Sequence, residues 1–310
     1  MRLVFELLGP IFLLVALGAG LQRGGFFGPG ALTGLNRLCY WVALPGLIGA
    51  SLMRGGPGAG GGWAAWEGDL LGLLGGVTLA VAAAGWAVAA ALRLEWRTRG
   101  TFTQAFFRGN LAFVGLPILL KVPGLEPARV LLLLAPMMIL YNLLAVGVLV
   151  ASRQGLGRAT WRAVAEEWLR NPILWASALG GLAYSRGWLL PAPLDETAGL
   201  IGKMAVPLAL VTIGAVLASL PTGAWCGPAW AAIAGKALVS PLLGWAATAA
   251  LGVTGLDRLV VLVALACPTA VVSYTMAGAM GGDEAMAAQT VVGSTVASAV
   301  VLAGLLAWGG

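Results

Sequence analysis

The chain has 310 residues, of which 60% are hydrophobic and only 10% are charged, and its mean hydropathy is +0.93. A water-soluble domain with this composition would expose a largely apolar surface, so the composition indicates a polytopic membrane protein. The formal net charge is +6, but the basic residues are scattered through the connections between apolar stretches. That distribution lacks the basic patch with interleaved aromatic residues that is typical of nucleic-acid binding, and it favours a role in membrane topology.

The residue types used most often for metal binding and acid–base catalysis are scarce. The chain has no histidine, which removes the commonest metal ligand and the usual proton shuttle. Cys39, Cys226 and Cys267 lie in or beside apolar stretches, where we expect small buried thiols rather than disulfides or a metal site. Paired carboxylates at membrane depth and a G-x-S-x-G turn are also missing. We therefore expect no enzyme activity, metal or other cofactor.

Apolar stretches separated by charged or Gly/Pro-rich connections predict ten membrane-spanning helices. They cover residues 3–22, 32–53, 69–92, 102–120, 127–151, 171–190, 197–219, 228–252, 257–280 and 285–308. At about 20 residues per crossing, ten helices use roughly two thirds of the chain and leave no room for a soluble domain. The segment Gly55 to Gly62 predicts a flexible loop. Residues 153–170 are the longest hydrophilic connection, and their tryptophans and arginines predict a short interfacial helix.

An internal repeat relates the two halves of this single membrane domain. Pro10-Ile11 and Ala16-Leu17-Gly18 recur 162 positions later as Pro172-Ile173 and Ala178-Leu179-Gly180. Five helices per half is an odd number, so the second copy must enter the membrane in the opposite sense. The sequence therefore predicts an inverted repeat of residues 1–152 and 171–310, joined by the connection at 153–170.

The distribution of Lys and Arg predicts the orientation in the membrane. With ten helices, the connection at 153–170 and the connection after the third helix fall on the more basic side. The positive-inside rule then places both in the cytoplasm and both termini outside, for a protein of the cytoplasmic membrane.

Two of the predicted helices are interrupted near their middle. Gly115 and Pro117 interrupt the fourth helix, and Pro268 interrupts the ninth. Proline lacks a backbone N–H and crowds the carbonyl four residues before it, so each proline frees a backbone acceptor. Irregular backbone at membrane depth is tolerated only where protein or a water-filled cavity covers it, which predicts a substrate site at the two breaks. The alternative for either proline alone is an ordinary kink.

If the two breaks meet, the second half of each helix presents free backbone N–H groups, from Ile118 and Thr269 onward, to a carboxylate. Asn110 lies two helical turns before Pro117 on the same face. The alternative for each polar side chain is a hydrogen bond to a neighbouring helix. The predicted substrate-binding residues are Asn110, Gly115, Pro117, Ile118, Tyr141, Asn142, Pro268, Thr269, Ser273 and Tyr274.

Several basic residues lie within or beside apolar stretches. Lys236 is the deepest and is a candidate attractor of anions. Lys203, Arg37 and Arg108 lie closer to predicted helix ends, where we expect their long side chains to reach the membrane surface.

Short motifs along nearly the whole chain resemble one known family in their order and spacing. They are Leu35-Asn36-Arg37 leading to Ala43-Leu44-Pro45, Gly109-Asn110 with Gly115-Leu116-Pro117, Tyr141-Asn142, Asn171-Pro172, Val206-Pro207-Leu208-Ala209-Leu210 with Gly214, and Pro268-Thr269-Ala270-Val271 with Ser273-Tyr274 and Ala277. The family is that of the auxin efflux carriers, which includes plant PIN-type carriers and bacterial permeases.

This resemblance implies an all-α membrane protein with ten helices in two inverted five-helix repeats, similar to bile-acid symporters and NhaA. Helices one, two, six and seven would form a scaffold, the others a transport domain, and helices four and nine would cross at their prolines. The implied substrates are organic anions, and the scaffold would form a homodimer. Gly278-Ala279-Met280 replaces a basic residue, Glu and Tyr that family members often carry, so the resemblance does not carry over any coupling role of those side chains.

The scarcity of buried acids bears on the driving force. Of the twelve Asp and Glu residues, Asp69 and Asp257 only begin predicted helices, and Glu6 alone lies further inside one, near its end, which disfavours coupling through carboxylates. Export of an anion from an inside-negative cell gains about 2.3 kcal/mol per charge per 100 mV. The sequence thus favours potential-driven export of organic anions by an elevator-type movement. The alternatives are a proton- or sodium-coupled anion symporter and a membrane sensor or scaffold without transport.

Overall fold

The computed structural model describes residues 2–54, 68–154, 162, 165–166, 169, 172–219 and 225–308. Within these ranges the chain is almost entirely helical, and its only β-type pairing is one isolated bridge. Five segments of the described chain are long and apolar enough to cross a membrane, namely Gly68–Ala91, Arg129–Arg153, Ala192–Ser219, Gly227–Ala250 and Glu284–Trp308. The expected all-α membrane protein is confirmed at this level.

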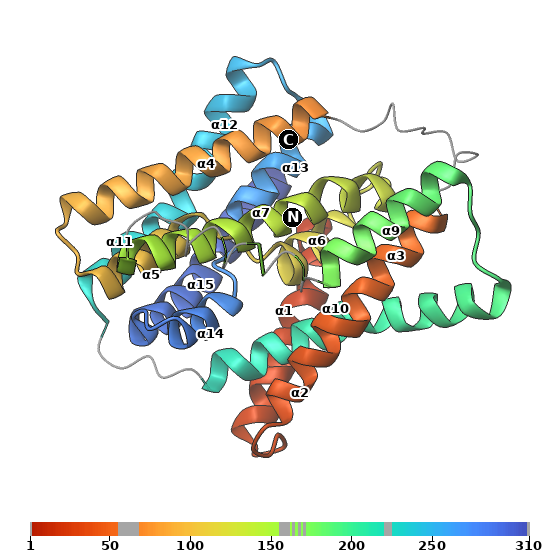
Figure 1. The fold of residues 1–310 in the computed structure, drawn as a ribbon, viewed down its shortest axis with the longest axis horizontal. Coiled ribbons are helices and arrows are strands. Elements are labelled where there is room, and N and C mark those ends of the chain that lie inside the picture. Colours follow the sequence, from red (N-terminus) through yellow and green to blue (C-terminus); the bar gives the residue numbers. More distant parts are fainter. Residues whose placement is uncertain are drawn as a thin grey trace.

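Figure 1 shows the helices in their order along the chain. The first half contains α1 (Arg2–Arg23), α2 (Ala31–Leu38), η1 (Cys39–Ala43), α3 (Leu44–Arg54), α4 (Gly68–Ala91), α5 (Trp96–Phe107), η3 (Leu111–Gly115), α6 (Leu116–Leu119) and α7 (Pro127–Gln154). The second half contains α9 (Pro172–Arg186), α10 (Ala192–Ser219), α11 (Gly227–Ala234), η4 (Gly235–Val239), α12 (Ser240–Ala250), α13 (Gly255–Ala266), α14 (Val272–Ala279) and α15 (Glu284–Trp308). Segments η1, η3 and η4 are π-helical.

Each predicted apolar stretch coincides with one helix or with a run of consecutive helical segments. The largest difference is at the fourth, where α5 begins at Trp96 instead of residue 102. The guanidinium groups of Arg97 and Arg99 stack over the rings of Trp96 and Trp86, which accommodates two charges in the first turn of α5. The predicted loop at Gly55 to Gly62 and most of the predicted interfacial helix at 153–170 lie outside the described residues.

Each π-helical segment ends directly before a helix that carries proline as its second residue. These prolines are Pro45 in α3, Pro117 in α6 and Pro241 in α12. In η3 the N–H of Leu116 donates to the carbonyl of Leu111, five residues back instead of four. The hydrogen-bond pattern of the helix therefore changes directly before Pro117, which has no N–H to donate. The chain is therefore helical from Leu111 to Leu119, and the predicted interruption at Gly115 and Pro117 is wrong.

The helices gather into two packed groups. Helix α1 packs along α10, and α3 packs against both α9 and α10. Added Cβ atoms at Gly18 and Gly214 would collide with the backbone of α10 and of α1, respectively, so these glycines let the two helices approach closely. The second group contains α4, α5 and α11 to α15, with α7 contacting both groups. In Figure 1, α3 and α9 lie on the opposite side of the molecule from α4 and α12.

Helices α5 and α13 form the centre of the second group. Every residue from Gly100 to Phe107 in α5 is buried, and so is every residue from Leu259 to Ala266 in α13. A helix that is buried on all faces is enclosed by other elements. Around α5 these are chiefly α4, α7, α11 and α15, and around α13 they are α4, α12 and α15. The C-terminal ends of both helices consequently lie in the protein interior.

Candidate substrate site where two interrupted helices meet

Two non-helical segments, at residues 108–110 and 267–271, lie against each other. The first separates α5 from η3, and the second separates α13 from α14. The N–H of Asn110 donates to the carbonyl of Pro268 at 2.7 Å, and the N–H of Ala270 donates to the carbonyl of Arg108 at 3.1 Å. Gly109 and Thr269 face each other as an isolated antiparallel β-bridge. The two segments thus satisfy part of each other's backbone hydrogen bonding, as irregular backbone at membrane depth requires.

The first break is centred on Gly109, not on Pro117. Arg108 is extended, with φ −74° and ψ 98°, and Asn110 has φ −81° and ψ 65°. A Cβ at Gly109 would lie 3.2 Å from the carbonyl oxygen of Ala264 and 3.4 Å from the Cβ of Cys267. Glycine therefore allows the close approach of the second break.

The backbone amides expected to be free at the breaks are occupied. The N–H of Thr269 donates to Ser294 Oγ at 2.9 Å, and the Thr269 hydroxyl donates to the carbonyl of Ala105 at 3.0 Å. Ile118 lies inside the continuous helical run of η3 and α6, so it does not begin a half-helix. The prediction that a carboxylate meets free amides from Ile118 and Thr269 onward is therefore wrong in its details.

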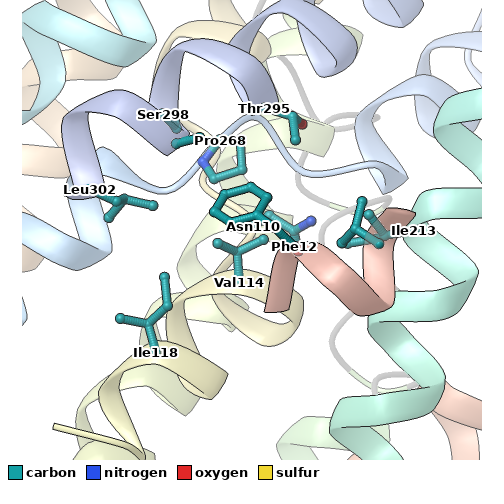
Figure 2. Close-up of a pocket in the computed structure, with 11 residues that line it drawn as sticks. Phe12, Asn110, Val114, Ile118, Ile213, Pro268, Thr295, Ser298 and Leu302 are labelled. Atoms are coloured by element: carbon teal, nitrogen blue, oxygen red, sulfur yellow. The ribbon is translucent and has the colours of Figure 1, made fainter. Parts of the chain in front are cut away.

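Asn110 lies between two small cavities, because it lines both of them. One, of about 20 Å³, has Phe12 of α1 and Ile213 of α10 on one side and Pro268 on the other (Figure 2). The second, of about 60 Å³, has Tyr40 of η1 and Leu44 of α3 facing the first break. Since one water needs roughly 10–15 Å³ of such volume, the first cavity holds about one water and the second a few. An organic anion requires the second cavity to widen.

Arg108 lines the larger cavity and is only 4% exposed. Its guanidinium group donates to Asn142 Oδ1, and Nη1 lies 2.6 Å from the sulfur of Met276. The expectation that Arg108 reaches the membrane surface is wrong, because α5 begins at Trp96 and residue 108 is twelve residues further along. At about 1.5 Å per residue that is roughly 18 Å, more than half of a hydrocarbon core about 30 Å thick. An earlier start for the helix, drawn to include Trp96, would have revealed this depth.

Lys236 is also fully buried, but its ammonium group faces backbone carbonyls. It donates to the carbonyl of Leu265 at 2.9 Å and to that of Phe107 at 3.3 Å. These oxygens belong to the ends of α13 and α5. Lys236 thus contacts backbone carbonyls and lines neither cavity, which does not support the role of anion attractor that the sequence indicated.

The remaining predicted residues divide between the cavity and its surroundings. Tyr141 and Asn142 line the larger cavity, and the Tyr141 ring packs against Phe107 with centroids 6.2 Å apart. Ser273 is buried, and its carbonyl accepts a hydrogen bond from Gln104 Nε2 at 3.0 Å. Gly115 faces the sulfur of Cys267, Tyr274 is partly buried in the core, and Pro117 is buried within α6. The structure therefore brings Asn110, Tyr141, Asn142 and Pro268 together and adds Arg108 to them.

The residues described by the structure contain no group of three or more His, Cys, Asp or Glu side chains that could hold a metal ion. The candidate site instead combines one buried cation with amide and aromatic side chains at a contact between two interrupted helices. In an all-helical chain with several membrane-length helices, this arrangement is typical of a polytopic membrane transporter.

A comparison with protein families agrees with this class. The model of a family described as membrane transport protein matches residues 3–158 and 156–306. The chain belongs to this family, that of the auxin efflux carriers, and is a multi-pass membrane transporter. A comparison with individual curated proteins gives no match.

Proposed function

We propose that this transporter carries organic anions with a carboxylate group and that Arg108 and Asn110 bind the carboxylate. The observation that carries the proposal is the buried guanidinium of Arg108 on the wall of the cavity beside both breaks. A guanidinium group presents paired N–H donors that match the two oxygens of a carboxylate, and such charge-assisted pairs are stronger than neutral hydrogen bonds. The side-chain amide of Asn110 adds a further donor on the same wall.

We further propose that the chain crosses the membrane ten times as two inverted five-helix repeats. The scaffold would comprise α1, α2 to α3, α9 and α10, and the transport domain would comprise the remaining helices. The close packing of α1 on α10 and of α3 on α9 supports this division. In the same arrangement the helices containing the breaks would cross at residues 108–110 and 267–271, and a homodimer would form through the scaffold.

The position of the two cavities supports an elevator-type movement as the proposed mechanism. Tyr40 and Leu44 face the first break across the larger cavity, and Phe12 and Ile213 face Asn110 across the smaller one. Both cavities thus lie between the proposed scaffold and the proposed transport domain. Sliding of one group against the other would widen a cavity on one side of the membrane at a time, which is alternating access around one site.

The membrane potential is the proposed driving force for export across the cytoplasmic membrane. We place the connection at 153–170 in the cytoplasm and both termini outside, following the Lys and Arg bias. An inside-negative potential of 100 mV favours export of each negative charge by about 2.3 kcal/mol. Proton or sodium coupling remains the alternative, and ionic conditions distinguish it.

Flux into proteoliposomes tests the function. The purified protein is reconstituted, and uptake of a radiolabelled dicarboxylate and of a radiolabelled aryl monocarboxylate is followed under an imposed potential. We expect saturable uptake of at least one of them that speeds up when the lumen is made positive and slows when the potential is reversed.

The same vesicles separate the alternatives. Replacing sodium by choline and collapsing the pH gradient should leave the flux unchanged. Flux that vanishes under either condition would favour a coupled symporter. Arg186→Gln, at the exposed end of α9, is the control for Arg108→Gln, because it also removes one positive charge. The absence of saturable flux of either anion in every condition would favour the sensor or scaffold.

A further inference from the structure

Lys236 occupies a position where two helices end together. It lies in η4, is 0% exposed, and its ammonium group contacts the carbonyl oxygens of Leu265 and Phe107 at 2.9 and 3.3 Å. Ser240 Oγ donates to the same Leu265 oxygen at 3.0 Å. The three interactions connect η4 and α12 to the ends of both interrupted helices.

These carbonyls carry partial negative charge for a structural reason. Phe107 is the last residue of α5, and Leu265 is the last but one of α13. The last four carbonyls of a helix have no partner within it, and each helix C-terminus carries about half a negative elementary charge. Two such ends converge here, so a single ammonium group offsets the charge of both. Burial of a lone ammonium is costly, and these carbonyl contacts compensate for it.

The local sequence lets the lysine reach this point. An added Cβ at Gly235 would collide with the ring of Phe106, so glycine allows η4 to lie directly on α5. A Cβ at Gly109 would come within 3.4 Å of Lys236 Nζ, which places the ammonium group immediately behind the first break. The lysine therefore supports the two breaks from the side of their helix ends, whereas Arg108 faces the larger cavity.

We propose that the carbonyl oxygens of Phe107 and Leu265 form a binding site for an ammonium-type monovalent cation, which the Lys236 side chain fills as a tethered ligand. Removing the side chain opens this site to a soluble alkylammonium ion. The inference concerns how the meeting point of the helices is held, and it is independent of which substrate is transported. Its test uses the folded protein alone.

The test is chemical rescue of Lys236→Ala, measured as thermal stability of the purified protein in detergent. The substitution removes three carbons and the nitrogen, which together correspond to n-propylammonium. We expect the melting temperature of the variant to fall by roughly 5–15 °C, as for buried carbonyl groups that lose their hydrogen-bond donor. Propylammonium chloride should restore at least half of that loss with a saturable dose response.

Matched controls define the result. Tetramethylammonium chloride has the same charge but no N–H donor, and it should not restore stability. Lys203→Ala, at an exposed position of α10, should melt like the wild type and respond to neither salt. A Lys236→Ala variant that melts within about 1 °C of the wild type, or that responds equally to both salts, would overturn the proposal.

A second variant tests the proposal if Lys236→Ala cannot be purified. Lys236→Met keeps a long unbranched side chain and removes the charge and the donors. We expect it to melt clearly below the wild type and, because its side chain still fills the space, to gain nothing from propylammonium. If Lys236→Met is as stable as the wild type, or if propylammonium adds neither yield nor stability to Lys236→Ala, the carbonyl pair needs no ammonium ligand.

Discussion

The two breaks differ in the groups that they contribute. The first, Arg108 to Asn110, contains a buried guanidinium and an amide side chain that line the cavity. The second, Cys267 to Val271, contributes mainly hydrogen bonds that hold the structure, through the carbonyl of Pro268 and the hydroxyl of Thr269. Segments at comparable positions in the two halves thus contribute different kinds of groups. In the proposed site, the first segment presents groups to the ligand and the second positions them.

The largest effect is expected for Arg108. Arg108→Gln removes the only charge in the proposed ligand set and leaves Asn142 without its charged donor. Truncating one partner of a buried charge pair costs about 2–5 kcal/mol, which corresponds to roughly 30- to 5,000-fold weaker anion binding. Competition of unlabelled anion against radiolabelled flux in proteoliposomes measures this change. A binding constant within threefold of the wild type would remove Arg108 from the site.

Asn110 should show the next largest effect. Asn110→Asp keeps the size of the side chain but places a negative charge on the wall shared by both cavities. Repulsion of a carboxylate should weaken anion binding at neutral pH by at least tenfold, or about 1.4 kcal/mol. Asn142→Asp is the comparison, because a carboxylate there pairs with Arg108 and competes with the substrate. Equal binding by Asn110→Asp and wild type would show that the first break does not contact the anion.

Thr269 tests the difference between the two breaks, because its substitution should lower stability and leave anion binding unchanged. Thr269→Val loses the hydrogen bond from the hydroxyl to the carbonyl of Ala105. A net loss of about 1 kcal/mol should lower the melting temperature by roughly 2–4 °C. The apparent affinity for the anion should stay within twofold. A selective loss of affinity at unchanged melting temperature would assign Thr269 to the ligand site.

The smallest effect is expected for Pro117. Because the chain is helical on both sides of it, Pro117→Ala should change transport by less than about twofold and slightly favour the helix. Pro268→Ala should reduce transport more, since residue 268 lies in the break and proline disfavours continuation of α13. Initial rates of flux compare the two variants. A larger loss for Pro117→Ala would reverse this order and restore the original prediction.

The positions of the helices follow from local hydropathy, which is why the predicted stretches agree with the observed helical segments. The position of the first break does not. Pro117 was predicted to interrupt the helix, but the wide turn at Leu111 to Gly115 accommodates it. Three consecutive residues, Arg108 to Asn110, form the break because they pair with the second break, which is a tertiary contact that no local pattern reveals.

Some site residues can likewise be predicted from local sequence, whereas others depend on tertiary contacts. Asn110, Tyr141, Asn142 and Pro268 were found from their polarity or backbone chemistry within apolar stretches, and the structure brings them together. The depth of Arg108 depends on where α5 begins, which the arginines of its first turn concealed. The partners of Lys236 depend on the convergence of two helix ends, so its burial could be anticipated from sequence but its contacts could not.

The central claim is that a carboxylate binds at Arg108 beside the two breaks. A thermal-shift titration of small carboxylates against detergent-purified wild type and Arg108→Gln tests it most directly, because a ligand that binds only the folded state raises the melting temperature. We expect that at least one carboxylate stabilises the wild type with a saturable dose response and does not stabilise Arg108→Gln. Equal stabilisation of both proteins by the same carboxylate would contradict it.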